Sequence, residues 1–462
     1  MIKTFLFMVS FIIGVLTFLS PKHPEKVNNS AEKMGTANQN LSEKRVLSPS
    51  TTQQLIDSIT AFKATLTSAQ LALVQREYSL ANAKVWSNLP AQLSARIGLR
   101  MADLTATQVA AAMACVKIAS GTTANEGYAE IQQLLGADDY LLANGGGSAY
   151  GAGQYYLNFF GTPSLTGTWE FQFGGHHMTL ANTYINGNLV GATPAFRGVE
   201  PFAAFTYNGA SVQPMVQDRD SFVTMLAGLT ATQLASAKLS STFSDLVLAP
   251  GKDWQFPTTR QGLQCNTLSA AQKALVLAAI KTYVYDIDNQ SAATIMAKYT
   301  NELDQTYIAY SGNASLLVQN DYVRIDGPSV WIEYNTQGGI IFRNVPHPHS
   351  VWRDRSGDYG GTGNPTAVQA TPSVVTGVKN YPNPATQSIN IDINLTNNAE
   401  ISVSIFDLNG KLIQNAFQGT LSEGQHVLPV NVSTLSSGSY IYTVKSNEKG
   451  VIRTLSKQMI KM

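Results

Sequence analysis

Six histidines occur in the 462-residue chain, and four of them form two tight groups. His176 and His177 follow two glycines, and His347 and His349 flank a proline. Neutral imidazole is a common ligand of zinc, copper and iron, and three imidazoles that leave one coordination position open make a catalytic type of site. The two groups therefore predict a site for one divalent transition metal, zinc or copper, built from distant stretches of chain.

Strand geometry limits which of these rings can meet. Residues two apart share a face, so His347 and His349 can converge, whereas His176 and His177 point to opposite faces unless the backbone is bent. The expected ligands are His347, His349 and one residue of the pair, and the apolar residues that continue the face of His176 favour His177. The alternative is a set of hydrogen-bonded structural or substrate-contacting histidines without metal.

A polar run near the second histidine group supplies candidates for catalysis. Glu333 lies in an aromatic strand pattern, where an acid is costly unless it is paired. In an enzyme, Glu333 or Asp354 would move the proton, and Arg353 would hold an anionic group or a developing charge. The alternatives for Glu333 are to orient a histidine or to form a structural ion pair with Arg353 or Arg324.

One motif, Leu-[Ser/Thr]-x-x-Gln, occurs four times in the central region. It predicts a capping box, in which the hydroxyl accepts from the backbone of the third helical residue and the Gln reaches back to the N–H of the cap. The uneven spacing of the copies argues against a true repeat array. The copies begin at Leu66, Leu104, Leu229 and Leu268.

Hydrophobic periodicity places these motifs in an α+β domain with a helical N-terminal part. Helical patterns cover residues 52–85, 105–120, 220–245 and 269–310, the last broken near residues 286–288. Alternation predicts strands at 169–173, 322–325 and 330–334, with a Gly327-Pro328 turn between the last two. A further strand is expected at 340–345, so the strands should form an antiparallel meander.

Several aromatic and polar segments of this region form a recognisable set. They are Tyr155-Tyr156, Phe160 to Pro163, Trp169 to His177, Tyr322 to Pro328, Ile332 to Tyr334 and His347 to Gly360. With them, residues 55 to 362 resemble the domain of unknown function 3500 family. The resemblance implies that the polar elements form one shared site, but it brings no established activity.

The last 80 or so residues have the pattern of a small all-β sandwich. Isoleucines alternate with polar residues from Ile389 onward, and Asn409-Gly410 predicts a type I′ turn. This region resembles the type A sorting domain of type IX secretion substrates in Bacteroidetes, which implies recognition by that machinery after passage through the periplasm, and release or attachment at the cell surface. The plain alternative is a β-sandwich binding module. The resemblance rests on Tyr381 to Pro384, Ile405 to Lys411, Leu435 to Tyr440 and the tail from Lys457 to Lys461.

The remaining segments complete the domain plan. An apolar run from Phe5 to Leu19 is too short to cross a bilayer comfortably, so residues 1–20 are expected to be a signal peptide and the mature chain to have no transmembrane segment. Residues 21–50 are expected to be a flexible leader, 51–362 the central domain, 363–378 a linker and 379–462 the sorting domain.

Composition narrows the possible partners. A net charge of +1 without a concentrated Lys/Arg patch argues against nucleic acid. The two cysteines, Cys115 and Cys265, are too few for a Cys-based zinc knuckle, and they leave open one disulfide or two buried thiols.

Two functions therefore fit the exported chain: a metal-dependent enzyme of unknown reaction, or a non-catalytic surface protein that binds a glycan or another small molecule. The second would use aromatic side chains near the first histidine group as a stacking platform. Packing in a core is the plain alternative for these residues, which are Tyr150, Tyr155, Tyr156, Phe159 and Phe160.

Overall fold

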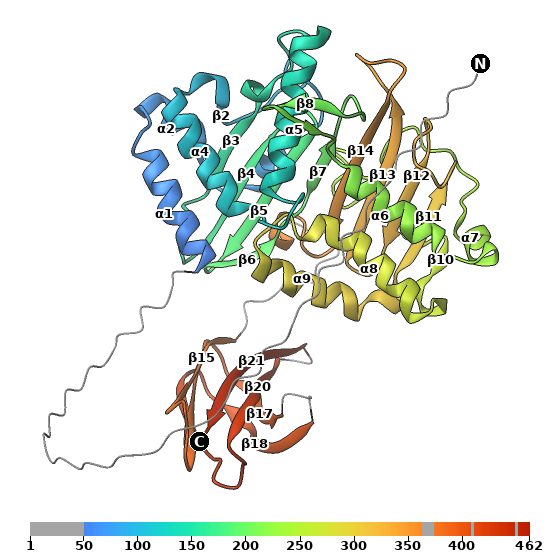
Figure 1. The fold of residues 1–462 in the computed structure, drawn as a ribbon. Coiled ribbons are helices and arrows are strands. Elements are labelled where there is room, and N and C mark those ends of the chain that lie inside the picture. The colour runs from blue at the N-terminus through green and yellow to red at the C-terminus, as the bar shows by residue number, and fades with distance from the viewer. Residues whose placement is uncertain (1–49, 363–373, 408–410, 449–450) are drawn as a thin grey trace, which may run out of the picture. The chain divides into compact units, whose positions relative to one another are not determined.

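The computed structural model describes residues 50–362, 374–407, 411–448 and 451–462 (Figure 1). The expected signal peptide, the leader up to residue 49, most of the linker and the Asn409-Gly410 turn lie outside these residues. The described chain forms helices with a large mixed sheet in the central region, followed by small antiparallel sheets. The fold class expected from the sequence is confirmed.

The first half of the central region begins with helices and ends with strands. Its elements are α1 (Thr51–Lys63), α2 (Ser68–Val74), β1 (Gln75–Arg76), α3 (Leu80–Ala83), β2 (Leu99–Arg100), η1 (Met101–Asp103), α4 (Ala106–Ala119), α5 (Tyr128–Leu141), η2 (Leu142–Gly146), η3 (Ala152–Gln154), β3 (Tyr156–Phe160), β4 (Thr168–Gly175), β5 (Met178–Ile185), β6 (Asn188–Gly191) and β7 (Ala195–Gly198). A small hairpin of β8 (Phe205–Tyr207) and β9 (Ala210–Val212) follows.

The second half repeats the main part of this order, without counterparts of β1, α3, η2 and β6 among its described residues. Its elements are α6 (Val216–Ala227), α7 (Ala231–Ala237), β10 (Leu263–Gln264), η4 (Cys265–Thr267), α8 (Ala270–Val284), α9 (Asn289–Asn301), η5 (Leu303–Gln305), β11 (Tyr307–Ser311), β12 (Tyr322–Asp326), β13 (Val330–Gly338), β14 (Pro346–Asp354) and η6 (Tyr359–Gly361). The strand pairing repeats too, because β2 pairs with β3 just as β10 pairs with β11. The central region is therefore an internal duplication.

The capping boxes belong to this duplication. All four have both of their reciprocal hydrogen bonds, so the predicted helix starts are confirmed. Within each half the two capping glutamines also bond to each other, Gln70 with Gln108 at 3.1 Å and Gln233 with Gln272 at 2.7 Å. The spacing of the motifs is uneven because the structure holds a duplicated pair and no regular array.

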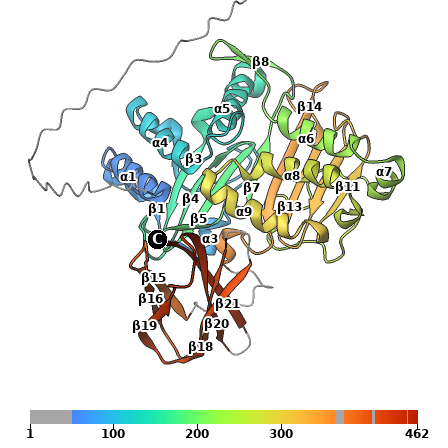
Figure 2. The same ribbon diagram turned by 60° about the horizontal axis from the view of Figure 1, so that its bottom comes forward.

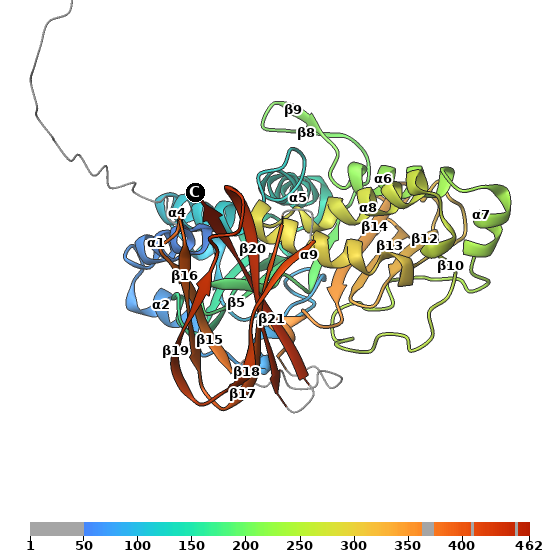
Figure 3. The same cartoon turned by 90° about the horizontal axis from the view of Figure 1, so that it is seen from below.

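The halves join through one twelve-stranded sheet. Its main path runs β1-β3-β4-β5-β7-β14-β13-β12-β11-β10, so the antiparallel pair of β7 and β14 lies at the junction. In Figures 1 and 2, α6 and α8 lie over the strands of the second half. The view from below shows the helices on one side of the sheet and the loop between α7 and β10 on the other (Figure 3). Apolar side chains of both halves share one core beneath the helices.

The bounds of the elements confirm one expectation from the sequence and correct others. The predicted break near residues 286–288 is confirmed, since α8 ends at Val284 and α9 begins at Asn289. The expected helix at 52–85 is instead three shorter ones, and α5 was missed. The strand expected at 340–345 was wrong: the next strand begins at Pro346, because the carboxylate of Glu200 binds the backbone N–H groups of Ile341 and Phe342 and holds this segment as a loop.

The C-terminal region has two antiparallel sheets, ordered β15-β16-β19 and β18-β17-β20-β21. Alternate residues of β16 and β17 are buried and share one core cluster, as the alternating isoleucines predicted. The strands are β15 (Val375–Tyr381), β16 (Ser388–Leu395), β17 (Ala399–Phe406), β18 (Leu412–Leu421), β19 (Gly424–Asn431), β20 (Gly438–Glu448) and β21 (Val451–Lys461).

Candidate metal centre

The first histidine group forms a tight turn. Gly175 pairs with Met178, so His176 and His177 are the two turn residues between β4 and β5. His177 has a φ of 63°, which bends the backbone, and the two rings stack with centroids 3.5 Å apart. The opposite directions expected on a straight strand are therefore not observed.

The second group meets this turn from across the sheet junction. His347 and His349 lie on one face of β14, as predicted, and their Nε2 atoms are 3.1 Å apart. The Nε2 atom of His177 lies 2.8 Å from that of His347 and 3.3 Å from that of His349. Ligand nitrogens around a tetrahedral zinc ion, with bonds of about 2.0–2.1 Å, are separated by about 3.3 Å. These three residues, His177, His347 and His349, are here called the histidine triad. Their Nε2 atoms have a spacing close to that of metal ligands.

Hydrogen bonding alone cannot satisfy this arrangement. An imidazole nitrogen is either a donor or an acceptor, never both at once. Among three mutually adjacent Nε2 atoms, at least two must therefore be in the same state, with two lone pairs or two N–H groups facing each other. A cation removes the conflict, since all three nitrogens then direct lone pairs at it.

Neighbouring groups keep these rings neutral and orient them. Burial lowers the pKa of His177 and of His347 well below the usual value, and the other histidines lower both further. Neutral imidazole is the form that binds metal. The Nδ1 atom of His349 lies 3.2 Å from a carboxylate oxygen of Asp245 and 2.8 Å from the amide nitrogen of Gln337. A carboxylate on the distal nitrogen is the usual support of a metal-bound histidine.

Glu200 lies beside His347 without a hydrogen bond to its ring. Its Oε1 atom accepts the backbone hydrogen bonds of the loop before β14, and its Oε2 atom lies 3.9 Å from Nδ1 of His347. Glu200 is buried, so it places a carboxylate next to the ring without contact to solvent.

His176 lies beside the histidine triad but outside it. Its Nδ1 atom is 2.5 Å from a carboxylate oxygen of Asp138, on α5, and the ring of Tyr150 meets it edge-on. Its ring stacks on that of His177, so the Asp138–His176 pair fixes one side of the histidine triad. The structure thus brings His177, and not His176, to His347 and His349.

Glu333 lies on the same sheet face as the histidine triad but has structural partners. It accepts hydrogen bonds from the backbone N–H groups of residues 247 and 248, from the hydroxyl of Tyr322 and from the indole of Trp331. Neither Arg353 nor Arg324 forms an ion pair with it within the described residues. Four donors fill a carboxylate, so these contacts account for its burial without a catalytic role.

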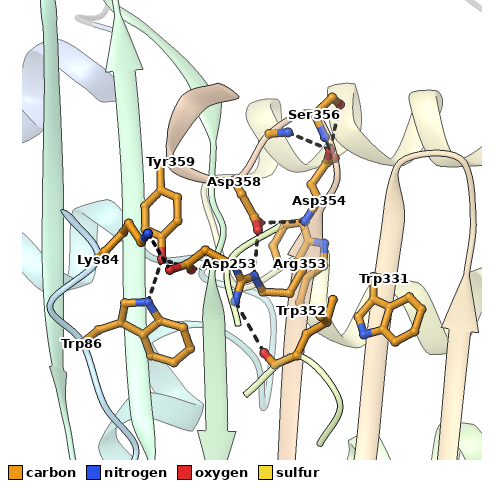
Figure 4. A network of polar contacts seen from close by, with 12 residues as sticks. Lys84, Trp86, Asp253, Trp331, Trp352, Arg353, Asp354, Ser356, Asp358 and Tyr359 are labelled. Carbon is orange, nitrogen blue, oxygen red and sulfur yellow. Dashed lines mark hydrogen bonds and ion pairs between the residues drawn. The ribbon is translucent and has the colours of Figure 1, made fainter. Parts of the chain in front are cut away.

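Arg353 and Asp354 belong to a separate polar network, shown in Figure 4. Arg353 is fully buried and forms ion pairs with Asp358 and Asp253. Asp354, on the other face of the strand, binds Lys298 and several backbone and hydroxyl groups. Arg353 follows His349 by four residues, about 13 Å along an extended strand. The catalytic roles expected for Glu333, Arg353 and Asp354 stay predictions, and the structure shows all three tied to neighbours.

The aromatic residues near the first histidine group mostly form core. Tyr155, Phe159 and Phe160 are completely buried, and Tyr150 is nearly so. Packing, the plain alternative for this group, accounts for these four. The two cysteines are buried free thiols.

Sequence analysis missed the carboxylates that support the histidine triad. Asp138, Glu200 and Asp245 come from a helix, from a segment after β7 and from the loop between α7 and β10. None lies in a motif, and each reaches the site through tertiary folding alone. The close approach of Gly198 was also missed: a Cβ atom there would lie 3.0 Å from ring carbons of both His177 and His349.

Comparison with known families agrees with the two regions. The model described as a protein of unknown function (DUF3500) matches residues 48–361. The chain belongs to this family. The histidine triad and its supporting carboxylates all lie within the matched part of this DUF3500 protein.

A second family model, described as a secretion system C-terminal sorting domain, matches residues 379–461. The protein is therefore a type IX substrate, exported to the cell surface or secreted. Every helix in the described residues is too short or too polar to cross a bilayer.

No curated protein matches the chain. Among solved structures, one match is dimeric latent PorU from Porphyromonas gingivalis, with 16% identity and a TM-score of 0.19. It covers 33% of this chain and only 14% of the PorU chain, so the likeness is too weak to assign a fold.

Proposed function

We propose that this exported protein is a metal-dependent enzyme, with His177, His347 and His349 as the ligands of one zinc or copper ion. The convergence of three Nε2 atoms within 3.3 Å supports this most directly. Three protein ligands leave a coordination position for water or substrate, whereas structural zinc sites are closed by four.

Two carboxylates lie beside the ring nitrogens that face away from the triad. Asp245 lies 3.2 Å from Nδ1 of His349, and 46% of its side chain is exposed. A buried carboxylate oxygen of Glu200 lies 3.9 Å from Nδ1 of His347. We assign Asp245 as a positioning residue that orients His349, and Glu200 as a buried negative charge beside His347.

Metal analysis of the purified full chain tests the site. We expect one metal ion per chain in the wild type and less than about one tenth of that in a His347→Ala/His349→Ala double variant, because two of three ligands are lost. His426→Ala, which changes a half-buried histidine of the C-terminal region, is the matched control and should keep the metal. A wild type that stays metal-free after incubation with zinc and with copper would overturn the proposal.

Catalysis needs a second measurement. Turnover of peptide, ester or phosphoester substrates should disappear when the metal is chelated and return when it is added back. A stoichiometric metal without turnover of any of these substrates would favour the alternative, a surface protein that binds a glycan or another small ligand without reacting with it.

A further inference from the structure

A second group of charged side chains lies behind the histidine triad, on the helix-covered face of the sheet. Gly198 approaches the triad rings, and its neighbour Arg197 extends to the other face of β7. There the guanidinium contacts Glu130 of α5 at 2.6 Å and forms an ion pair with Asp286, which follows α8. All three of these charged side chains are buried.

Carboxylates outnumber the cations in this group, which are the buried Arg197 and, near Glu126, the exposed Lys281. Glu126, Glu130 and Asp286 each offer an oxygen atom within 4.8 Å of the others, and all are buried. Asp218 of α6 interacts with the same glutamates. Four carboxylates thus face one buried guanidinium, and uncompensated charge is costly in a protein interior.

Asp218 is a second, independent observation. Its side chain is completely buried, and neither carboxylate oxygen accepts a hydrogen bond of good geometry within the described residues, because the nearby hydroxyl of Thr282 donates to the carbonyl of Ala279. Buried polar atoms are nearly always paired, so this one needs an explanation. The carboxylates of this group must hold either protons or a cation.

We propose that Glu126, Glu130 and Asp286 bind one hard divalent cation of the calcium class, with Asp218 beside them as a further carboxylate. Oxygen-only ligands with several carboxylates favour such an ion over the transition metals that histidine prefers. The half-buried side chain of Gln217 donates to Glu126 and Glu130, and also to the backbone carbonyl of Asn125. This site is independent of the function proposed for the histidine triad.

The cation fastens the two halves of the duplication to each other. Glu126 and Glu130 come from the first half, and Asp218 and Asp286 from the second. Asp286 also accepts a 2.5 Å hydrogen bond from the backbone N–H of Gly127, which caps α5. Helix α5 also carries Asp138, two turns after Glu130. An ion bound at Glu130 therefore also holds the helix that supports His176.

Calcium titration of the full chain tests this proposal, since imidazoles bind calcium poorly and the histidine triad does not interfere. We expect a saturable rise in Tm of about 5 °C once Ca²⁺ exceeds its Kd about 100-fold, against NaCl of equal ionic strength. Tb³⁺, a luminescent calcium substitute, should bind at one ion per chain and be displaced by Ca²⁺.

The matched variants remove charge and keep volume. A Glu126→Gln/Asp218→Asn double variant should lose the calcium response, whereas Glu170→Gln, a buried carboxyl elsewhere, should keep it. If Ca²⁺, Mg²⁺ and Mn²⁺ all leave the wild-type Tm unchanged and Tb³⁺ does not bind, the group holds protons only and the proposal is wrong. A double variant that responds like the wild type would also refute it. The Tb³⁺ stoichiometry of the wild type decides the matter even if the double variant does not fold.

Discussion

Single residues decide how closely the histidine triad can assemble. A methyl group at position 198 would press on two of the three rings. We therefore expect Gly198→Ala to weaken zinc affinity by about 10-fold or more, the effect usual for residues that orient metal ligands. Competition with a zinc chelator measures this. Gly377→Ala, in a strand where a Cβ atom meets open space, is the control. Unchanged affinity in Gly198→Ala would show that the rings can move aside without loss.

A second residue-scale prediction concerns pH. Burial raises the pKa of Glu170 to about 8, although Thr183 and Gln172 both donate to it. An unfolded glutamate titrates near 4.3, so between these pH values the folded protein holds the extra proton and stability falls as pH rises. Glu170→Gln should remove this loss and raise Tm at pH 8 by about 2 °C or more, with little effect at pH 4.5. A Tm difference that is the same at both pH values would contradict it.

The sequence identified the histidines at this scale because they are rare and clustered. It could not show that His177 converges with β14, because the decisive feature is a left-handed turn residue rather than strand alternation. It could not find Asp138 or Asp245 either, because a carboxylate in a helix or a loop looks like any surface acid until the fold brings it to a ring.

At the scale of elements, local signals were the most informative. Capping boxes act within four residues, so the starts of α2, α4, α7 and α8 could be read directly. Helix α5 carries no side-chain cap and buries Glu130 and Asp138, which hides its apolar periodicity. Elements whose polar residues face inward therefore escape pattern analysis.

The linked capping glutamines give an element-scale prediction. Gln108 donates to the carbonyl of Thr65 at 2.8 Å and is buried, while its counterpart Gln272 donates to Gly228 at 2.9 Å and is less buried. We expect Gln108→Ala to lower the free energy of unfolding by about 1–3 kcal/mol and Gln272→Ala by less, because buried groups left without partners cost more. Urea denaturation of both variants measures the difference. Equal losses would mean that burial does not set the cost.

At the scale of the whole molecule, the duplication explains why the site lies where it does. The first half supplies the turn with His177, the second half supplies β14, and the β7–β14 pair joins them. A duplicated sheet with one junction places segments from both halves side by side there. The uneven spacing of the capping motifs already reflected the duplication. Only the strand pairing, however, shows that the motifs come in two pairs.

The two regions of the chain should also separate export from metal binding. The core of the central region and the core of the C-terminal sheets share no residue, and the histidine triad lies wholly in the former. Ending the chain after Thr362 should leave metal stoichiometry unchanged and shift Tm by less than about 2 °C. In the native host, the shortened chain should stay in the periplasm, because the matched sorting domain is gone. The full-length His347→Ala/His349→Ala variant should behave in the opposite way and reach the cell surface or medium without metal. Metal analysis and cell fractionation measure both, and a shortened chain that is exported, or that loses its metal, would show that the two functions are coupled.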